Sequence, residues 1–310
     1  MSFSSDVKNE IIKREYTREL AAISELAAMI CFGGKLKKID DGYVFYILSE
    51  NPKISRRAYS LMKGALGINS KIKIRKSSDK VTSYEVVVEN TEDINRLFQA
   101  TYLIDADKSV KSFVSFRIDP KLVVTRERKA AFVRGAFITC GSVMDPRKNY
   151  HLEFATSHYT LSGEFANLLE ELGVPAKSVI RKSKYVLYYK SSELITDVLT
   201  VLGAVNSLMD YHNAKIVKEI NNNINRTMNC ENANINKTVD ASIEQATCIQ
   251  KLIDKGVFDT LPDNLQQIGR LRLEYRQHSL KELGEMLNPP IGKSGVNHRL
   301  RKLMDIANGM

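Results

Sequence analysis

Cysteine, proline and long apolar runs are all scarce in this chain of 310 residues. Its four cysteines lie far apart without a C-x-x-C pair, which excludes zinc ribbons, redox dithiols and a disulfide framework and favours buried free thiols. With 7 prolines, 16 glycines and 43% hydrophobic residues, the composition also excludes a disordered or fibrous chain. The length of the chain suggests two folded domains.

The longest apolar stretch, residues 20–32, is interrupted by Ser24 and Glu25 and is shorter than the roughly 20 residues that span a bilayer. The first residues, MSFSSD, contain neither the basic segment nor the apolar segment of a secretion signal. We therefore expect a cytoplasmic protein that makes no membrane contact.

Acidic residues are outnumbered, with 36 Asp and Glu against 46 Lys and Arg. The excess lies at the two ends: residues 1–130 hold 24 basic and 17 acidic side chains, and residues 261–310 hold 8 and 5. Residues 53–80 carry nine basic side chains against Asp79 alone. Such a segment repels itself unless a polyanion lies opposite, so the pattern favours a phosphate-binding surface; a merely solvated face is the alternative.

An internal repeat appears when the chain is compared with itself at a spacing of 106 to 107 residues. Residues 43–55 (YVFYILSENPKIS) align with residues 150–162 (YHLEFATSHYTLS). The tetrapeptide at 74–77 (IRKS) returns at 180–183 (IRKS). Two related lobes imply a pseudo-twofold axis.

Both repeated units, about residues 19–103 and 127–205, show the same local signals. A helical spacing of apolar residues is followed by a hairpin, a second helix, a second hairpin and a third helix. In the first unit Gly33 and Gly34 end the first helix, and an Asp-Gly pair marks the turn of the hairpin. Each half has the order αββαββα, so we predict an α+β domain over residues 1–210.

Basic side chains would lie on one face of the predicted sheets. They are Lys71, Lys73, Arg75, Arg181, Lys182 and Lys184. Because residues alternate between the faces of a strand, the three basic residues of 71–75 project together while Ile72 and Ile74 face the core. In the second unit Lys182 and Lys184 share a face. Two such sheets side by side would form a saddle about as wide as a DNA duplex, which favours DNA binding over a solvated surface.

The duplication resembles the LAGLIDADG homing-endonuclease fold, in which two lobes meet through a pair of closely packed helices and hold DNA on their sheets. Residues 26–34 (LAAMICFGG) and 133–142 (VRGAFITCGS) occupy the signature positions. Small residues in these segments, such as Ala28 and Gly135, would let the two helices approach closely.

Nucleases of that fold carry an acidic residue just before the final glycine of each motif, and the two carboxylates hold divalent metal. Here Gly33 and Cys140 stand at these lost catalytic positions, and neither supplies the oxygen ligand that Mg²⁺ needs. Asp40, Asp41 and Asp145 lie beyond the helix ends as conceivable substitutes, but they are typical of turns. We therefore expect no enzymatic activity, no metal site and no cofactor.

Asparagine dominates the next segment, with eight in residues 221–236. Apolar residues from Ile216 to Ile253 keep close to helical spacing, so residues 211–256 are predicted to be a helical linker, as one long helix or a pair. Asparagine is a weak helix former, which leaves disorder as the alternative. A polar helix here could equally lie along phosphates.

Residues 257–310 are predicted to form an all-α helix-turn-helix domain. A helix starts after Pro262, and the capping box of residues 279–282 (SLKE) opens a second helix. A third helix begins near Ser294 and buries an apolar stripe from Val296 to Ala307. Its other side, which we call the donor face, carries Lys293, Ser294, Asn297, His298, Arg301 and Lys302. This arrangement is typical of a recognition helix in the DNA major groove; a solvated three-helix surface is the alternative.

The combined pattern is similar to the WhiA family. The acid-free duplication, the Asn-rich linker and the segments 128–135 (RKAAFVRG) and 293–303 (KSGVNHRLRKL) carry this resemblance, which covers nearly the whole chain. It implies a bacterial DNA-binding protein that is required for sporulation in filamentous organisms and is linked to cell division and chromosome segregation in others.

Three functions remain open at this point. A sequence-specific transcription factor would read bases with the third C-terminal helix and contact phosphates through its sheets. A nucleoid-associated division protein would bind DNA with little promoter specificity, and a residual metal-dependent endonuclease is the third candidate. Double-stranded DNA at the nucleoid is the expected partner. The transcription machinery or another regulator is a candidate second partner, and no small-molecule substrate is expected.

Overall fold

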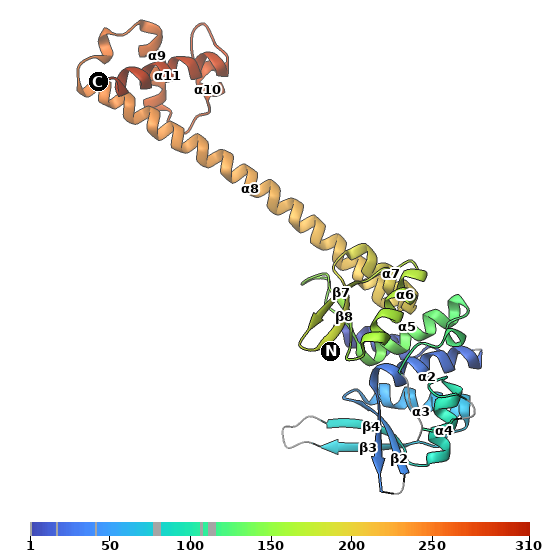
Figure 1. The fold of residues 1–310 in the computed structure, drawn as a ribbon. Helices are drawn as coiled ribbons and strands as arrows, with labels where there is room; N and C mark the ends of the chain where they lie inside the picture. Colours follow the sequence, from blue (N-terminus) through green and yellow to red (C-terminus); the bar gives the residue numbers. More distant parts are fainter. Residues whose placement is uncertain (1, 17, 41, 77–81, 106–107, 111–115) are drawn as a thin grey trace. The chain divides into compact units, whose positions relative to one another are not determined.

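The computed structural model describes residues 2–16, 18–40, 42–76, 82–105, 108–110 and 116–310. By its contacts the chain divides into unit 1, Met1–Lys218, and unit 2, Glu219–Met310. The division into 1–210, 211–256 and 257–310 stays a prediction. Figure 1 shows the ribbon of the chain, with the helices and strands of each unit labelled.

Unit 1 contains two lobes with the same order of elements. The first lobe comprises α2 (Glu19–Gly33), β1 (Gly34–Ile39), β2 (Gly42–Ser49), α3 (Pro52–Leu66), β3 (Lys71–Lys76), β4 (Thr82–Val88) and α4 (Thr91–Ala100). The second lobe comprises α5 (Arg126–Cys140), β5 (Gly141–Val143), β6 (Leu152–Thr156), α6 (Tyr159–Glu171), β7 (Lys177–Arg181), β8 (Lys184–Tyr189) and α7 (Ser192–Leu202). The predicted order αββαββα is confirmed. A short helix α1 (Phe3–Ile12) precedes the first lobe, and a 3-10 turn η1 (Pro120–Leu122) lies between the lobes.

Each lobe has one antiparallel sheet of four strands. The strand orders, β1-β2-β4-β3 and β5-β6-β8-β7, are equivalent, as the duplication requires. In both sheets the second strand of the first hairpin pairs with the second strand of the second hairpin. In Figure 1 the strands of both lobes lie on one side of the helices.

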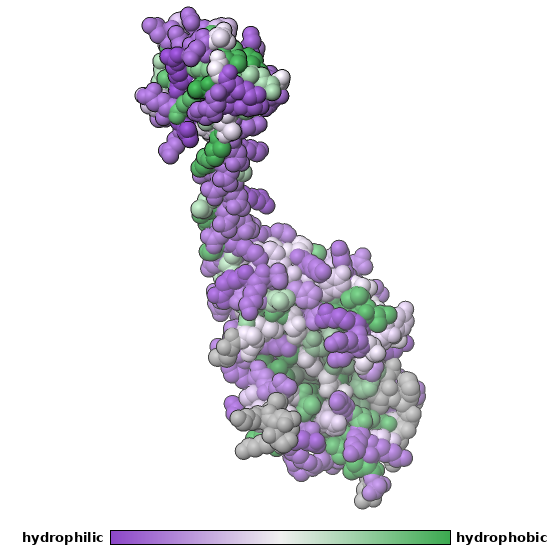
Figure 2. Space-filling view, turned by 90° about the vertical axis from the view of Figure 1, so that its left-hand side faces the viewer, coloured by the Kyte–Doolittle hydropathy of each residue, from purple (hydrophilic) through white to green (hydrophobic). Residues whose placement is uncertain are grey.

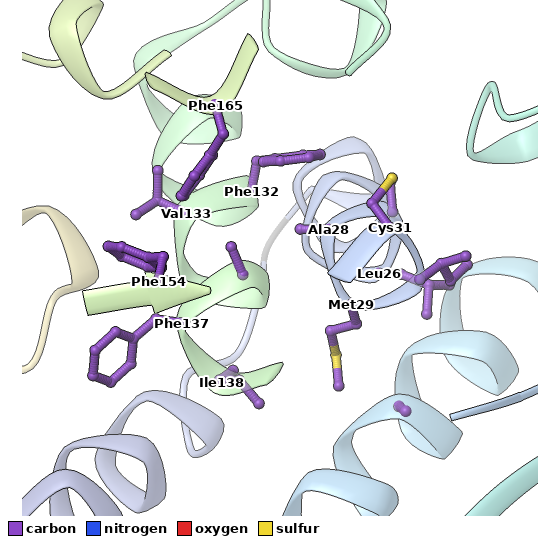
Figure 3. Packing of buried hydrophobic residues seen from close by; sticks show 14 of the residues in the cluster. Leu26, Ala28, Met29, Cys31, Phe132, Val133, Phe137, Ile138, Phe154 and Phe165 are labelled. Atoms are coloured by element: carbon purple, nitrogen blue, oxygen red, sulfur yellow. The ribbon is translucent and has the colours of Figure 1, made fainter. Parts of the chain in front are cut away.

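The lobes meet through α2 and α5, two helices of 15 residues each (Figure 3). Figure 3 shows Ala28 of α2 between the two helices. Opposite it, an added Cβ at Gly135 would overlap the backbone oxygen of Glu25 and lie 2.9 Å from the Cβ of Ala28. The predicted close approach of small residues is therefore present, and Gly135 leaves no room for a side chain.

One continuous core surrounds this helix pair and includes residues of both lobes. Phe32 at the end of α2 lies against Phe165 of α6, with ring centroids 5.0 Å apart in an edge-on arrangement. Phe165 in turn contacts Phe154 of β6 at 5.1 Å. Burial of these rings removes a large apolar area from water and holds the lobes together.

A buried polar cluster, which we call the interlobe cluster, interrupts this apolar interface. Glu25 of α2 is fully buried, and both of its oxygens accept from Arg57 of α3, at 2.7 and 3.1 Å. The hydroxyl of Tyr16 also donates to Glu25, and it accepts from Nε of Arg134 of α5 at 3.0 Å. Burial and the neighbouring carboxylate raise the pKa of Tyr16, so its hydroxyl stays protonated. The cluster therefore connects α3, α2 and α5 by hydrogen bonds.

A single helix, α8 (Val205–Asp254), runs over the Asn-rich segment. All of residues 221–241 are exposed, and Figure 2 shows a mostly hydrophilic surface there with scattered apolar side chains. The four cysteines are free, but the expected burial is wrong for Cys230, which lies on this exposed stretch. No helix among the described residues is long and apolar enough to cross a membrane.

The C-terminal part of unit 2 contains a 3-10 turn η2 (Phe258–Thr260) and the helices α9 (Asp263–Glu274), α10 (Leu280–Glu285) and α11 (Lys293–Asn308). The predicted capping box is confirmed: Ser279 accepts from the amide of Glu282, whose carboxylate accepts from the amide of Ser279. The predicted stripe of α11 is confirmed too. Its four members, Val296, Leu300, Leu303 and Ala307, are fully buried in a core of their own with α9 and α10.

Replacing Arg57 with alanine is expected to lower the free energy of unfolding by about 3–5 kcal/mol, because the buried carboxylate of Glu25 would lose its charged partner. Urea denaturation followed by circular dichroism measures this change. The control is Arg18→Ala, whose pair with Glu127 spans 3.8 Å with side chains 77% and 42% exposed. It should change the stability by less than about 1 kcal/mol. Equal losses from both substitutions would contradict the role given to the cluster.

Candidate nucleic-acid interfaces

The open face of the first sheet carries basic side chains on both edge strands. Pairing places Lys35 opposite Tyr46, Tyr46 opposite Val87, and Val87 opposite Lys71, so these side chains point to the same side. The basic residues of this face are Lys35, Lys37, Lys71, Lys73 and Arg75. The prediction omitted the two on β1, although their alternation in residues 34–39 (GKLKKI) was visible in the sequence.

Acidic side chains next to β3 partly neutralise this face. The ammonium groups of Lys71 and Lys73 lie 2.7 and 2.5 Å from the carboxylate of Glu89. Their hydrogen bonds lower the pKa of Glu89 to about 2, so it is ionised at neutral pH. Arg75 pairs with Glu85 at 2.9 Å. A phosphate that binds here must therefore compete with carboxylates already in place.

The predicted burial of Ile72 and Ile74 is wrong, since these side chains are 39% and 62% exposed. Pairing does place them on the same side as Val86 of the central strand β4, which is fully buried. The difference arises because β3 is the edge strand. Alternation along a strand decides the side of the sheet but not whether a helix covers that side.

On the second sheet, Arg181 and Lys184 lie directly opposite each other on β7 and β8 and share the open face. Lys182 and Ser183 form the two-residue turn between these strands, with φ of 49° and 60°. The prediction that Lys182 shares a strand face with Lys184 is therefore wrong, because the chain reverses between them. Lys177 of β7 lies on the face of Arg181 by alternation and was not predicted.

The acid Glu153 lies on the open face of the second sheet as well. It accepts from Nε2 of His151 at 2.9 Å and lies 3.7 Å from the guanidinium of Arg181. Lys177, Lys182 and Lys184 have no hydrogen-bond or ion-pair partner within the described part of the chain. Both sheets therefore present uncompensated positive charge, because Lys35 and Lys37 of the first sheet also have no hydrogen-bond or ion-pair partner among the described residues.

The lost catalytic positions end the two central helices, with Gly33 last in α2 and Cys140 last in α5. An added Cβ at Gly33 would overlap the side chain of Thr139, so even the start of a carboxylate side chain lacks space. Burial raises the pKa of the Cys140 thiol to about 12, which keeps it protonated. The residues present do not fit the metal site of a nuclease of this fold.

The suggested substitutes do not change this conclusion. The carboxylate of Asp145 accepts from Nε and Nη2 of Arg147 at 3.0 and 2.8 Å, in a turn after β5. Asp41 lies outside the described residues, next to Asp40 in the first hairpin. Within the described ranges, no three His, Cys, Asp or Glu residues gather as a metal site would require.

The donor face lies on the outer side of α11. Five of its six residues are exposed and Asn297 is half-buried. None of the six side chains has a hydrogen-bond or ion-pair partner among the residues that the structure describes. On the first sheet, by contrast, carboxylates pair with Lys71, Lys73 and Arg75. The donors of α11 are therefore available to an external acceptor.

A duplicated LAGLIDADG-like domain without the nuclease acids, followed by a helix-turn-helix region, defines the class of this protein. Three family models match it: the WhiA N-terminal LAGLIDADG-like domain over residues 19–104, the WhiA LAGLIDADG-like domain over 129–221 and the WhiA C-terminal HTH domain over 224–307. The chain belongs to the WhiA family.

Curated relatives agree with this assignment, and a solved structure has a similar fold. Proteins named "Probable cell division protein WhiA" from Alkaliphilus metalliredigens and Clostridium tetani are 41% and 40% identical to the chain. Each alignment covers 99% of this chain, and 98% and 97% of the two relatives. The crystal structure of full-length DUF199/WhiA from Thermatoga maritima has a TM-score of 0.60 at 23% identity, covering 100% of this chain and 99% of that one.

The carboxyl group of Glu89 is expected to titrate with a pKa of about 2 instead of the ordinary 4.5. Because its pKa is lower in the folded chain, the pairing stabilises the fold above pH 4.5, and this contribution is lost as the pH falls toward 2. NMR titration of the glutamate side chains measures the pKa.

Replacing Lys71 and Lys73 with alanine should return the pKa of Glu89 to its ordinary value. The matched control is Lys35→Ala, which removes a basic side chain from the same face but from β1, and it should leave this pKa low. A wild-type midpoint near 4.5 would contradict the assigned pairing.

Proposed function

We propose that this protein is a sequence-specific DNA-binding regulator of transcription that acts in cell division and, in sporulating organisms, in sporulation. The observation that carries the proposal is the donor face of α11, which has no partner among the described residues and lies opposite a fully buried stripe. Such a helix can enter the major groove without disturbing its own core. Arg301 can donate two hydrogen bonds to guanine, and Asn297 can pair with adenine.

The two sheet faces support a second role in the same complex. Their lysines and arginines suit phosphate oxygens, which position a protein on DNA but carry no sequence information. Pairing with Glu85 and Glu89 weakens the contribution of the first sheet, whereas Lys177 and Lys184 of the second are unpaired within the described residues. Lys35 and Lys37 of the first sheet are unpaired there too. We therefore assign base recognition to α11 and sequence-independent affinity to the two sheets.

The proposal includes no catalytic step. Gly33 and Cys140 supply no carboxylate at the helix ends, so the endonuclease hypothesis has no donor set to support it. Double-stranded DNA is the proposed partner, and the protein would act at the nucleoid in the cytoplasm. A second protein partner, the transcription machinery or another regulator, rests on the family resemblance alone.

A nucleoid-associated protein without promoter specificity is the second candidate. It is favoured by the sheet faces, because their basic side chains follow strand edges and suit any duplex. The two candidates differ in whether α11 distinguishes base sequences. A comparison of specific with non-specific duplexes therefore separates them.

Replacing Arg301 and Lys302 with alanine should weaken binding to a target duplex about 10- to 100-fold, since one bidentate base contact contributes about 1–3 kcal/mol. Binding to an unrelated duplex should weaken much less. Fluorescence anisotropy at one fixed salt concentration measures both affinities. The control, Lys53→Ala with Arg56→Ala, removes the same charge from α3 and should affect neither strongly. Equal weakening on both duplexes would favour the nucleoid-associated candidate.

Replacing Glu89 with glutamine should strengthen binding to every duplex alike, because it frees Lys71 and Lys73 for phosphates. The dependence of log affinity on log salt should steepen by about 0.9 for each additional DNA phosphate that the variant neutralises. Replacing the two lysines with alanine should not steepen it. Unchanged DNA binding by Glu89→Gln would show that the first sheet does not face DNA.

A further inference from the structure

A cavity of about 470 Å³ in unit 1 is lined by three arginines, Arg14, Arg126 and Arg134. We call it the arginine cavity. It lies at the N-terminal end of α5, whereas the strands of the second lobe follow the C-terminal end of that helix. Its lining residues come from helices and the segments that follow them, and none lies on a strand, so the cavity is separate from the open sheet faces.

Arg134 is the most informative of the three. It is only 2% exposed, and Nε donates to the Tyr16 hydroxyl at 3.0 Å. Its Nη groups have no acceptor among the residues described. Burying a guanidinium is unfavourable unless its donors are used, and this side chain lines the cavity. The Nη groups are not among the fully buried polar atoms without a partner, so they reach solvent, where an external acceptor can bind them.

The other two arginines add charge without internal compensation. Arg14 lies against Gly203 at the end of α7, and Arg126 is the first residue of α5. Neither side chain has a hydrogen-bond or ion-pair partner within the described ranges. The one acid that lines the cavity, Glu127, lies 3.8 Å from Arg18, which is not a lining residue.

The start of α5 makes the cavity more favourable for an anion. Thr125 caps the helix by accepting from the amide of Arg128 at 3.3 Å, which leaves the amides of Arg126 and Glu127 without an intrahelical acceptor. The partial positive charge of this helix end has the same sign as the three guanidinium groups.

We propose that the arginine cavity binds a phosphorylated small molecule. Guanidinium groups bind phosphoryl oxygens through two parallel hydrogen bonds, and three arginines line this cavity. The apolar side chains of Leu172 and Val201 line the same cavity and can contact the remainder of the molecule. The volume is within the range of small-molecule sites.

Occupancy of this site would act on the contact between the lobes. Arg134 donates a hydrogen bond to the Tyr16 hydroxyl, which in turn donates to Glu25 of α2. An anion bound to Arg134 would therefore restrain one end of the interlobe cluster. We therefore expect the ligand to raise the temperature at which unit 1 unfolds.

The test uses the full chain in phosphate-free buffer, with pyrophosphate and a nucleoside diphosphate as probes and with ionic strength matched by sodium chloride. Calorimetric titration and thermal unfolding should show saturable binding and a higher Tm. Arg14→Ala with Arg126→Ala should weaken binding about tenfold or more. Arg134 is left unchanged because it belongs to the interlobe cluster. The control, Lys53→Ala with Arg56→Ala, removes the same charge from α3 and should bind normally.

Two results would overturn the proposal. The first is the absence of saturable binding at millimolar concentrations of the probe. If the Arg14→Ala and Arg126→Ala variant then also has a lower Tm, the arginines instead compensate the C-terminal carbonyls of α6 and α7. Displacement of a bound probe by duplex DNA would identify a DNA phosphate as the natural acceptor. Unchanged binding by a duplex in the presence of the probe supports a separate site.

Discussion

The close approach of α2 and α5 is the constraint on which the rest of the structure depends. Gly135 permits this approach because any side chain there would overlap the backbone of Glu25. Each helix leads directly into the first strand of its sheet, through Gly34 and Gly141. The helix pair therefore joins the two sheets within one unit, in place of two independent modules.

The same helix ends explain why the fold persists without the chemistry. In nucleases of this fold they carry the metal-binding carboxylates, whereas here they carry Gly33 and Cys140, which supply no carboxylate. The sheet surfaces retain basic side chains, and acids such as Glu89 moderate their charge. The free donors lie on α11, in a separate core. We therefore propose that phosphate contact and base recognition lie in different units.

Much of the fold was predictable because the duplication shows each local signal twice. The capping box at Ser279 and the buried stripe from Val296 to Ala307 could also be predicted, because each depends only on neighbouring residues of one helix. The errors lie where a side chain depends on its surroundings. Lys182 was expected on a strand but lies in a turn. The position of a two-residue turn determines on which face of the sheet each following side chain lies, and the sequence did not show that position. The interlobe cluster was not predictable, because Tyr16 and Arg134 are 118 positions apart.

Genome-wide occupancy mapping in a bacterium that carries this protein tests the central claim, that the donor face of α11 distinguishes base sequences, most directly. We predict discrete peaks at promoters that share a sequence element, with footprints centred on that element. Diffuse coverage of the chromosome without a common element would contradict the claim.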